Sequence, residues 1–155
     1  MRRYRPGVDG PAVATVVYRS IQEVARRHYS ASQVQAWAPE PTDPSSLDVQ
    51  ACDGRRSFVA VDGAGTVVGF CDLQHDRHID HLFCAPEVAG TGVGSQMYEH
   101  LEATARAAGA TRLSVDASET ARPLFERHGF RVLARQVHER AGETLHNYRM
   151  VKDLG

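Results

Sequence analysis

The sequence predicts an α+β fold in one domain, residues 1–155: a mixed, mostly antiparallel central sheet of six to seven strands flanked by four helices. Two groups of short, largely apolar segments, at 58–84 and 130–151, are interrupted by tight turns, which is typical of antiparallel strands. Between them, apolar residues recur at three- and four-residue steps over 92–108, which indicates a helix. A chain of 155 residues is of single-domain size, and no internal repeat divides it.

The first part of the chain alternates a strand with helices. Residues 2–6 predict a short strand, and residues 11–27 carry one apolar face at helical spacing. A second, shorter helix follows and is capped by Ser30 or Ser32. Residues 39–55 contain three prolines and predict a loop with about one helical turn.

Turn and cap residues indicate where the remaining strands and helices begin and end. Asp62 to Gly65 forms a hairpin turn, Ser118 caps a helix that Gly129 ends, and Ala141-Gly142 turns the last hairpin. Strands are expected at 58–61, 66–74, 79–84, 112–116, 130–139 and 143–151, and the late helix at 118–128. The expected order is therefore strand, two helices, a three-strand meander, helix, strand, helix and two strands.

Composition excludes several classes of protein. The net charge of −1 gives no electrostatic reason to expect nucleic acid as a partner. No apolar run approaches the length of a membrane span, and the N-terminus lacks the apolar core of a signal peptide. Three cysteines without metal spacing predict free thiols in a reducing cytoplasm. His75, His78 and His81 alternate between strand faces, so no metal site is expected.

A glycine-rich loop follows the strand at 79–84. Gly90, Gly92 and Gly94 alternate with other residues immediately before a helix, so free N–H groups and the helix dipole can hold a phosphate. The dinucleotide fingerprint fails because its last glycine falls on Ser95. The nucleotide P-loop fails because the only lysine is Lys152.

What remains resembles the acetyl-CoA loop of the GNAT superfamily of N-acetyltransferases, Arg/Gln-x-x-Gly-x-Gly/Ala. Here the loop is Ala89-Gly90-Thr91-Gly92-Val93-Gly94, with alanine where Arg or Gln is usual. Residues 121–130 also look like the closing helix and Gly-Phe turn of that superfamily. The order of elements matches over essentially the whole chain, so the resemblance implies the GNAT fold.

The resemblance implies acetyl-CoA as the co-substrate. Its pantetheine arm would lie where the fourth and fifth strands splay, and its pyrophosphate would rest on backbone N–H groups of the glycine loop. The implied cofactor contacts are Leu82, Phe83, Cys84, Ala89, Gly90, Thr91, Gly92, Val93, Gly94, Ser95, Ser118 and Phe125. Phe125 stands where many members carry the tyrosine that protonates the leaving thiolate, and it has no hydroxyl.

The implied reaction is direct acetyl transfer to a primary amine of a small molecule or peptide. Asp80 and His81 are the candidate bases; strand alternation puts them on opposite faces, so at most one faces the acceptor, and Asp80 is favoured. Tyr29 or Tyr148 is an alternative proton donor. Tyr29, Trp37 and Tyr148 are expected to border the acceptor pocket.

Two other functions stay open from the sequence. An acyl-CoA-binding regulatory or interaction module fits the alanine at position 89, where Arg or Gln is usual, and the lack of a hydroxyl at Phe125. A toxin that acetylates aminoacyl-tRNA fits less well, because the near-zero net charge predicts no basic face. A homodimer is compatible with the sequence, which names neither the acceptor nor the oligomeric state.

Overall fold

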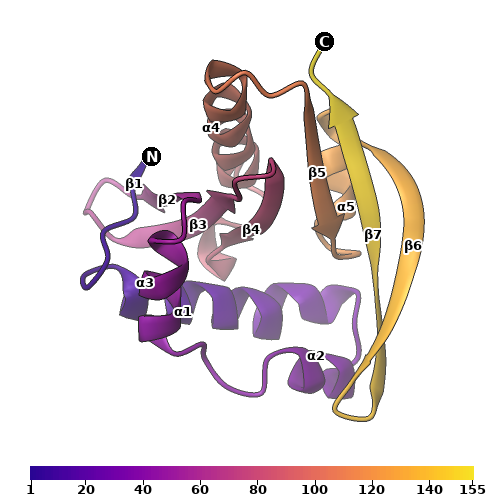
Figure 1. Cartoon of the computed structure of the whole chain (residues 1–155). Coiled ribbons are helices and arrows are strands. Elements are labelled where there is room, and N and C mark those ends of the chain that lie inside the picture. The colour runs from indigo at the N-terminus through magenta and orange to yellow at the C-terminus, as the bar shows by residue number, and fades with distance from the viewer.

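The computed structural model describes all 155 residues and contains one seven-stranded sheet (Figure 1). The strand order is β1-β2-β3-β4-β5-β7-β6, and every neighbouring pair is antiparallel except β4 and β5. The strands are β1 (Arg2–Arg3), β2 (Arg56–Val61), β3 (Val67–Leu73), β4 (His78–Cys84), β5 (Arg112–Ala117), β6 (Arg131–Arg140) and β7 (Glu143–Asp153). The predicted fold class, a mixed and mostly antiparallel α+β sheet, is confirmed.

Five α-helices accompany the sheet, one more than the sequence predicted. They are α1 (Gly10–Arg19), α2 (Ala31–Trp37), α3 (Pro44–Ala51), α4 (Val93–Ala107) and α5 (Arg122–Arg127). Helix α3 occupies the segment expected to be mostly loop. It forms because Asp43 accepts a hydrogen bond from the N–H of Ser45 and Pro44 occupies the first turn, where no N–H is needed.

Two helices differ in part from the sequence prediction: the predicted helix 11–27 changes its helical type after Arg19, and the late helix starts after Ser118. The first helix continues beyond α1 as a π-helical turn, Ser20–Val24, and a 3₁₀ turn, Ala25–Arg27. Helix α5 starts at Arg122 and not at Ser118, whose hydroxyl instead accepts a hydrogen bond from the N–H of Ala121 at 3.1 Å. Ser118 thus caps the turn before α5 and not the helix itself.

The core lies on both faces of the sheet. Helices α4 and α5 cover one face, where Met97, Leu101 and Phe125 are buried. Helices α1, α2 and α3 cover the other face, where Val13, Val34 and Leu47 pack with strand residues. No helix in the chain has both the length and the apolar character needed to span a bilayer.

The sheet is divided between β4 and β5. These parallel strands pair only at His78 with Ser114 and at Ile79 with Val115, and then diverge (Figure 1). The backbone of the second half of β4 has no strand on that side. This splay is the gap that the resemblance implied for the pantetheine arm.

Candidate active site

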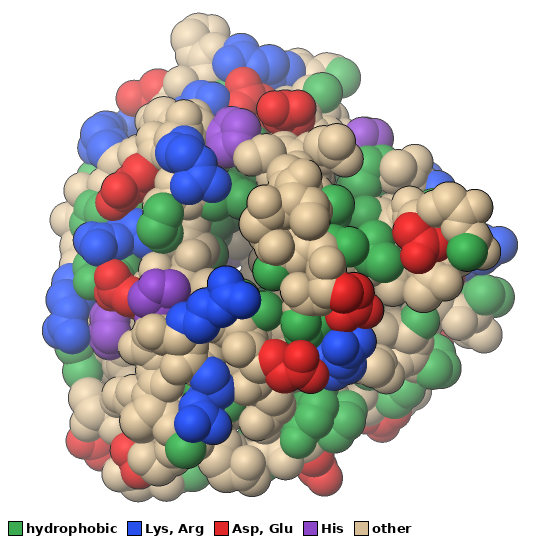
Figure 2. Space-filling model, turned by 180° about the vertical axis from the view of Figure 1, so that it is seen from behind, with side chains coloured by type: hydrophobic (Ala, Val, Ile, Leu, Met, Phe, Trp, Pro, Cys, Tyr) green, Lys and Arg blue, Asp and Glu red, His purple; other side chains and the backbone are tan.

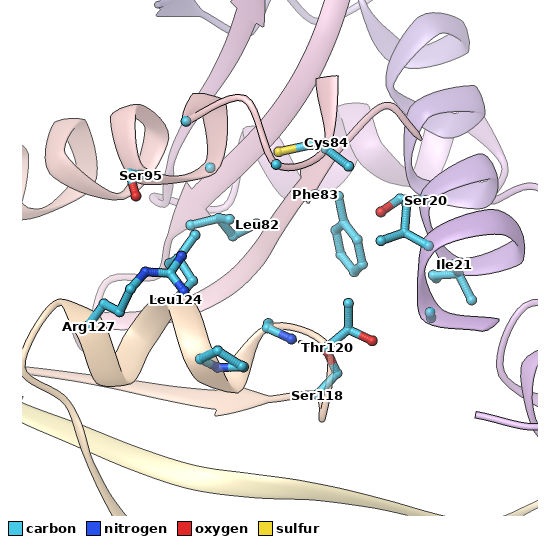
Figure 3. A pocket seen from close by; sticks show the side chains of 18 of the residues that line it. Ser20, Ile21, Leu82, Phe83, Cys84, Ser95, Ser118, Thr120, Leu124 and Arg127 are labelled. Carbon is cyan, nitrogen blue, oxygen red and sulfur yellow. Dashed lines mark hydrogen bonds between the residues drawn. The ribbon is translucent and has the colours of Figure 1, made fainter. Parts of the chain in front are cut away.

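A cavity of about 410 Å³ opens beside the free edge of β4. Its wall comes from the π-helical turn Ser20–Val24, the end of β4, the glycine loop and α5 with the turn before it (Figure 3). In the close-up, Phe83 points between Ser20 and Thr120, and Leu82 faces Leu124. The face opposite that of Figure 1 is hollowed near its centre, with Lys and Arg side chains beside the hollow (Figure 2).

Most residues that the sequence assigned to a cofactor gather at this first cavity. Those that line it are Leu82, Phe83, Cys84, Ala89, Gly90, Gly92, Gly94, Ser95 and Ser118. Thr91 and Val93 do not line it. The Thr91 hydroxyl donates to the carbonyl of Val88 at 2.6 Å, and Val93 packs against the core.

The glycines of the loop have two different tasks. Gly90 and Gly92 adopt φ values of +77° and +94°, which favour glycine, and a Cβ atom at either would meet no atom within 4 Å. A Cβ atom at Gly94 would lie 2.8 Å from Cδ1 of Leu124. Gly90 and Gly92 therefore shape an open loop, whereas Gly94 lets α4 approach α5.

Phe125 lies in the core and not at the cavity, contrary to the sequence prediction. Its side chain is 1% exposed, lies between Tyr98 and Phe130, and lines no part of the cavity. The last helix turns this position toward the core, so Phe125 is a packing residue and the expected cofactor contact is wrong.

Arg127 is a cavity residue that the sequence analysis missed. It lies on α5, one turn after Leu124, and its side chain extends toward the gap between α5 and β4 (Figure 3). Its guanidinium forms no ion pair within the chain. Its spacing from Pro123 and Leu124, four and three residues, was the available signal, because such residues share a helix face.

A second cavity of about 300 Å³ adjoins the first, and both are lined by Trp37 and Ser118. Its walls are mostly polar and come from β4, the β6–β7 hairpin, β5 and the region of α2. Its lining comprises Tyr29, Trp37, His78, Asp80, His81, Asp116, Ser118, His138, Arg140, Leu145, His146 and Asn147.

Asp80 and His81 both line the second cavity, so the expectation that alternation separates them is wrong. The register between β3 and β4 pairs Asp72 with His81 and Leu73 with Ile79, which leaves Asp80 as an extra residue. Such a β-bulge interrupts the alternation of the strand and re-aims a side chain. Asp80 Oδ2 consequently lies 3.6 Å from His81 Nδ1.

His81 is held by a buried carboxylate. Its Nδ1 lies 2.9 Å from Oδ2 of Asp72, and its backbone N–H donates to Oδ1 of the same residue at 2.8 Å. Asp72 is fully buried on β3. Burial lowers the pKa of His81, but the hydrogen bond to Asp72 and the charges of Asp72 and Asp80 outweigh it, so the pKa lies above its usual 6.5.

Arg55 completes this group. Its Nη1 donates to Asp72 at 2.9 Å and to Asp80 at 2.8 Å. Asp72, Asp80 and His81 offer ligand atoms that all lie within 4.8 Å of one another, as a metal site would. The cation that the two carboxylates hold here is the Arg55 guanidinium, whose side chain is only 7% exposed.

The Tyr29 hydroxyl both donates and accepts a hydrogen bond. The hydroxyl donates to the carbonyl of His146 at 2.9 Å and accepts from the N–H of Glu119 at 2.8 Å. Tyr29 lines the second cavity, as Trp37 does, and packs against Trp37 edge to face. With both partners in the backbone, the Tyr29 hydroxyl ties the turn after β5 to β7.

Tyr148 is not part of either cavity, which corrects its expected place in the acceptor pocket. Its hydroxyl donates to Glu119 Oε2 at 2.7 Å, and the Arg122 guanidinium lies 4.5 Å above its ring. Glu119 Oε2 also lies 2.8 Å from His146 Nε2. Tyr148 therefore supports the turn after β5, in which Ser118 lines both cavities.

The fold is similar to that of known N-acetyltransferases. A GCN5-related N-acetyltransferase from Rhodopseudomonas palustris superposes with a TM-score of 0.88 at 33% identity, over 99% of this chain and 94% of that one. YafP of Escherichia coli (strain K12), an uncharacterised N-acetyltransferase, is 33% identical over 97% of this chain and 93% of its own. YncA from Salmonella typhimurium, solved with acetyl-CoA, has a TM-score of 0.75 at 17% identity, over 99% and 92% of the two chains.

The fold is thus that of an acyltransferase. Residues 25–152 match the acetyltransferase (GNAT) domain family, and the chain belongs to that family.

Proposed function

We propose that the protein transfers an acetyl group from acetyl-CoA to a primary amine of a small molecule or peptide, with His81 as the general base. The observation that carries this proposal is the Asp72–His81 pair in a cavity that adjoins the glycine-loop cavity. The acetyl donor would occupy the first cavity and the amine the second. The reacting atoms would meet near Trp37 and Ser118, which line both.

The first cavity suits acetyl-CoA chemically. The apolar side chains of Leu82, Phe83 and Leu124 fit a pantetheine arm, and the backbone N–H groups at Gly90 and Gly92 fit a pyrophosphate. Position 89 carries alanine and not the usual Arg or Gln. Arg127 can supply a positive charge for the pyrophosphate in its place, because its guanidinium is unpaired and lines the same cavity. That YncA, a protein of the same fold, was solved with acetyl-CoA supports this assignment.

The proton would pass from the amine to His81. With Nδ1–H donating to Asp72, the lone pair of the neutral imidazole is on Nε2. Nε2 takes the proton of the ammonium, and the free amine attacks the thioester carbon. The C–S bond breaks as the C–N bond forms, and the acylated nitrogen loses its second proton to water. Asp80 is the weaker candidate for the base because its carboxylate is already paired with Arg55.

The leaving thiolate would take its proton from water. A free thiol has a pKa of about 8.5, so the thiolate is a fair leaving group without a protein donor. Phe125 offers no hydroxyl and is buried, and the Tyr29 hydroxyl already donates to a carbonyl. This geometry favours solvent over both residues.

The catalytic proposal is preferred to a binding module that has lost its chemistry. Such a module would explain why position 89 lacks the usual Arg or Gln and position 125 lacks a hydroxyl, but a binding protein needs no oriented imidazole beside the ligand. Acetylation of aminoacyl-tRNA is disfavoured by the net charge of −1.

The function is tested by measuring binding and turnover separately. Acetyl-CoA should raise the melting temperature by mass action, and free thiol should appear when a suitable primary amine is added. A raised melting temperature without thiol release across a broad amine panel would support the binding module. No change in melting temperature at saturating acetyl-CoA would contradict both.

The substitution Asp72→Asn should shift the pH profile toward lower pH. Only neutral His81 accepts a proton, so kcat/KM of the wild type should rise with pH through a pKa above 6.5. An asparagine side chain would keep an acceptor but remove the charge that favours the imidazolium, and the pKa of His81 should fall. Initial rates between mildly acidic and mildly basic pH check this, and an unshifted profile would contradict the role of His81.

A further inference from the structure

The negative charges that line the second cavity are already neutralised by partners within the chain. Two carboxylates line it, and both are paired within the chain: Asp80 with Arg55 at 2.8 Å, and Asp116 with Arg149 at 2.6 Å. Asp116 also accepts from Gln136 at 2.9 Å. A polycationic acceptor would therefore find no free carboxylate on the wall of this cavity.

An unpaired positive charge lies on β6. Arg140 lines the same cavity and makes no ion pair or side-chain hydrogen bond within the chain. His138, two residues earlier on the same strand, also lines it without a side-chain partner. Residues two apart in a strand share a face, so the two side chains lie on the same side of the hairpin.

We propose that His138 and Arg140 form a subsite for an anionic group, so that the acceptor is an amine that also carries a carboxylate. This inference rests on the proposed function and adds the class of its substrate. His81 lies on β4 and Arg140 near the tip of the β6–β7 hairpin, and both line one cavity. A molecule in that cavity can place its amine at His81 and its anion at Arg140.

The physical basis is selection by charge. A guanidinium binds a carboxylate or phosphate through two parallel N–H donors, and a neutral imidazole adds one more donor. The matching uncharged amine would leave Arg140 without this partner and gain nothing in its place. The subsite therefore raises affinity for the anionic amine, and it also orients that amine toward His81.

The test compares amines that differ only in the anion. Tyrosine is paired with tyramine, and γ-aminobutyrate with butylamine, and each is titrated calorimetrically into the CoA-saturated protein. At least one carboxylated amine should bind about tenfold or more tightly than its partner, as a hydrogen bond to a charged group provides. In Arg140→Gln that preference should disappear, and in Arg140→Lys part of it should remain.

Arg135→Gln is the matched control, because Arg135 lies on the same strand but does not line the cavity. It should keep the preference of the wild type. Equal affinity within both pairs, or a preference that survives Arg140→Gln, would overturn the subsite. Thiol release, measured in separate samples that contain acetyl-CoA in place of CoA, separates the two proposals: an Arg140-dependent preference without thiol release supports the subsite and contradicts the transferase reaction.

Discussion

Replacement of His81 by alanine is expected to lower kcat by about a hundredfold to ten-thousandfold, the usual contribution of a general base. The fold should survive, because the buried Asp72 carboxylate keeps its ion pair with Arg55 and its hydrogen bond from the N–H of residue 81. Steady-state rates at saturating acetyl-CoA measure the loss. Calorimetry should give an acetyl-CoA affinity close to that of the wild type.

His78→Ala is the control for this experiment. His78 lies on the same strand and lines the same cavity, but its Nδ1 is 2.8 Å from the Ser114 hydroxyl and not from Asp72. A small effect on kcat is expected. If His81→Ala retained full turnover while His78→Ala lost it, the base would have been assigned to the wrong imidazole. If both variants retained it, water or Asp80 would serve.

The second large effect is expected from Gly92→Asp, which should weaken acetyl-CoA binding by about a hundredfold or more. Gly92 precedes α4 at the glycine loop, where a phosphate is expected. Two like charges 4 Å apart repel by about 4 kcal/mol near a protein surface. Isothermal titration with CoA measures the loss directly.

Gly92→Asn separates charge from shape in this experiment. Asparagine has nearly the size of aspartate, and both tolerate the left-handed backbone that Gly92 adopts at φ +94°. The melting temperatures of the two variants should therefore be similar without ligand, while only Gly92→Asp loses most of its affinity. Equal affinities for CoA would show that position 92 is not near a phosphate.

The fold was largely predictable because its elements are marked locally. Hairpin turns, helix caps and apolar periodicity located the strands and α4 to within a few residues. Helix α3 is less visible in the sequence because three prolines at 39–44 indicate a loop, although Asp43-Pro44 is a helix start. The π-helical turn Ser20–Val24 has no comparable local signal and depends on tertiary packing.

The site was predictable only where it is continuous in sequence. The glycine loop and the end of β4 follow one another in the chain, so one stretch indicated most of the first cavity. The second cavity combines β4 with β5, the β6–β7 hairpin and the region of α2. His81 could be suspected from its residue type, but its pairing with Asp72 depends on a strand register that periodicity does not determine.

The short pairing between β4 and β5 has a mechanical consequence. Only two residue pairs join the strands of the N-terminal part of the sheet to those of the C-terminal part, so the sheet cannot transmit tension across its middle as a continuous ladder does. The rest of the connection comes from side-chain packing between α4, α5 and the core residues beneath them, and from the hydrogen bonds of Tyr29 to His146 and Glu119. A ligand lying along the free edge of β4 would bridge this weak joint, and it would stiffen the protein as a whole.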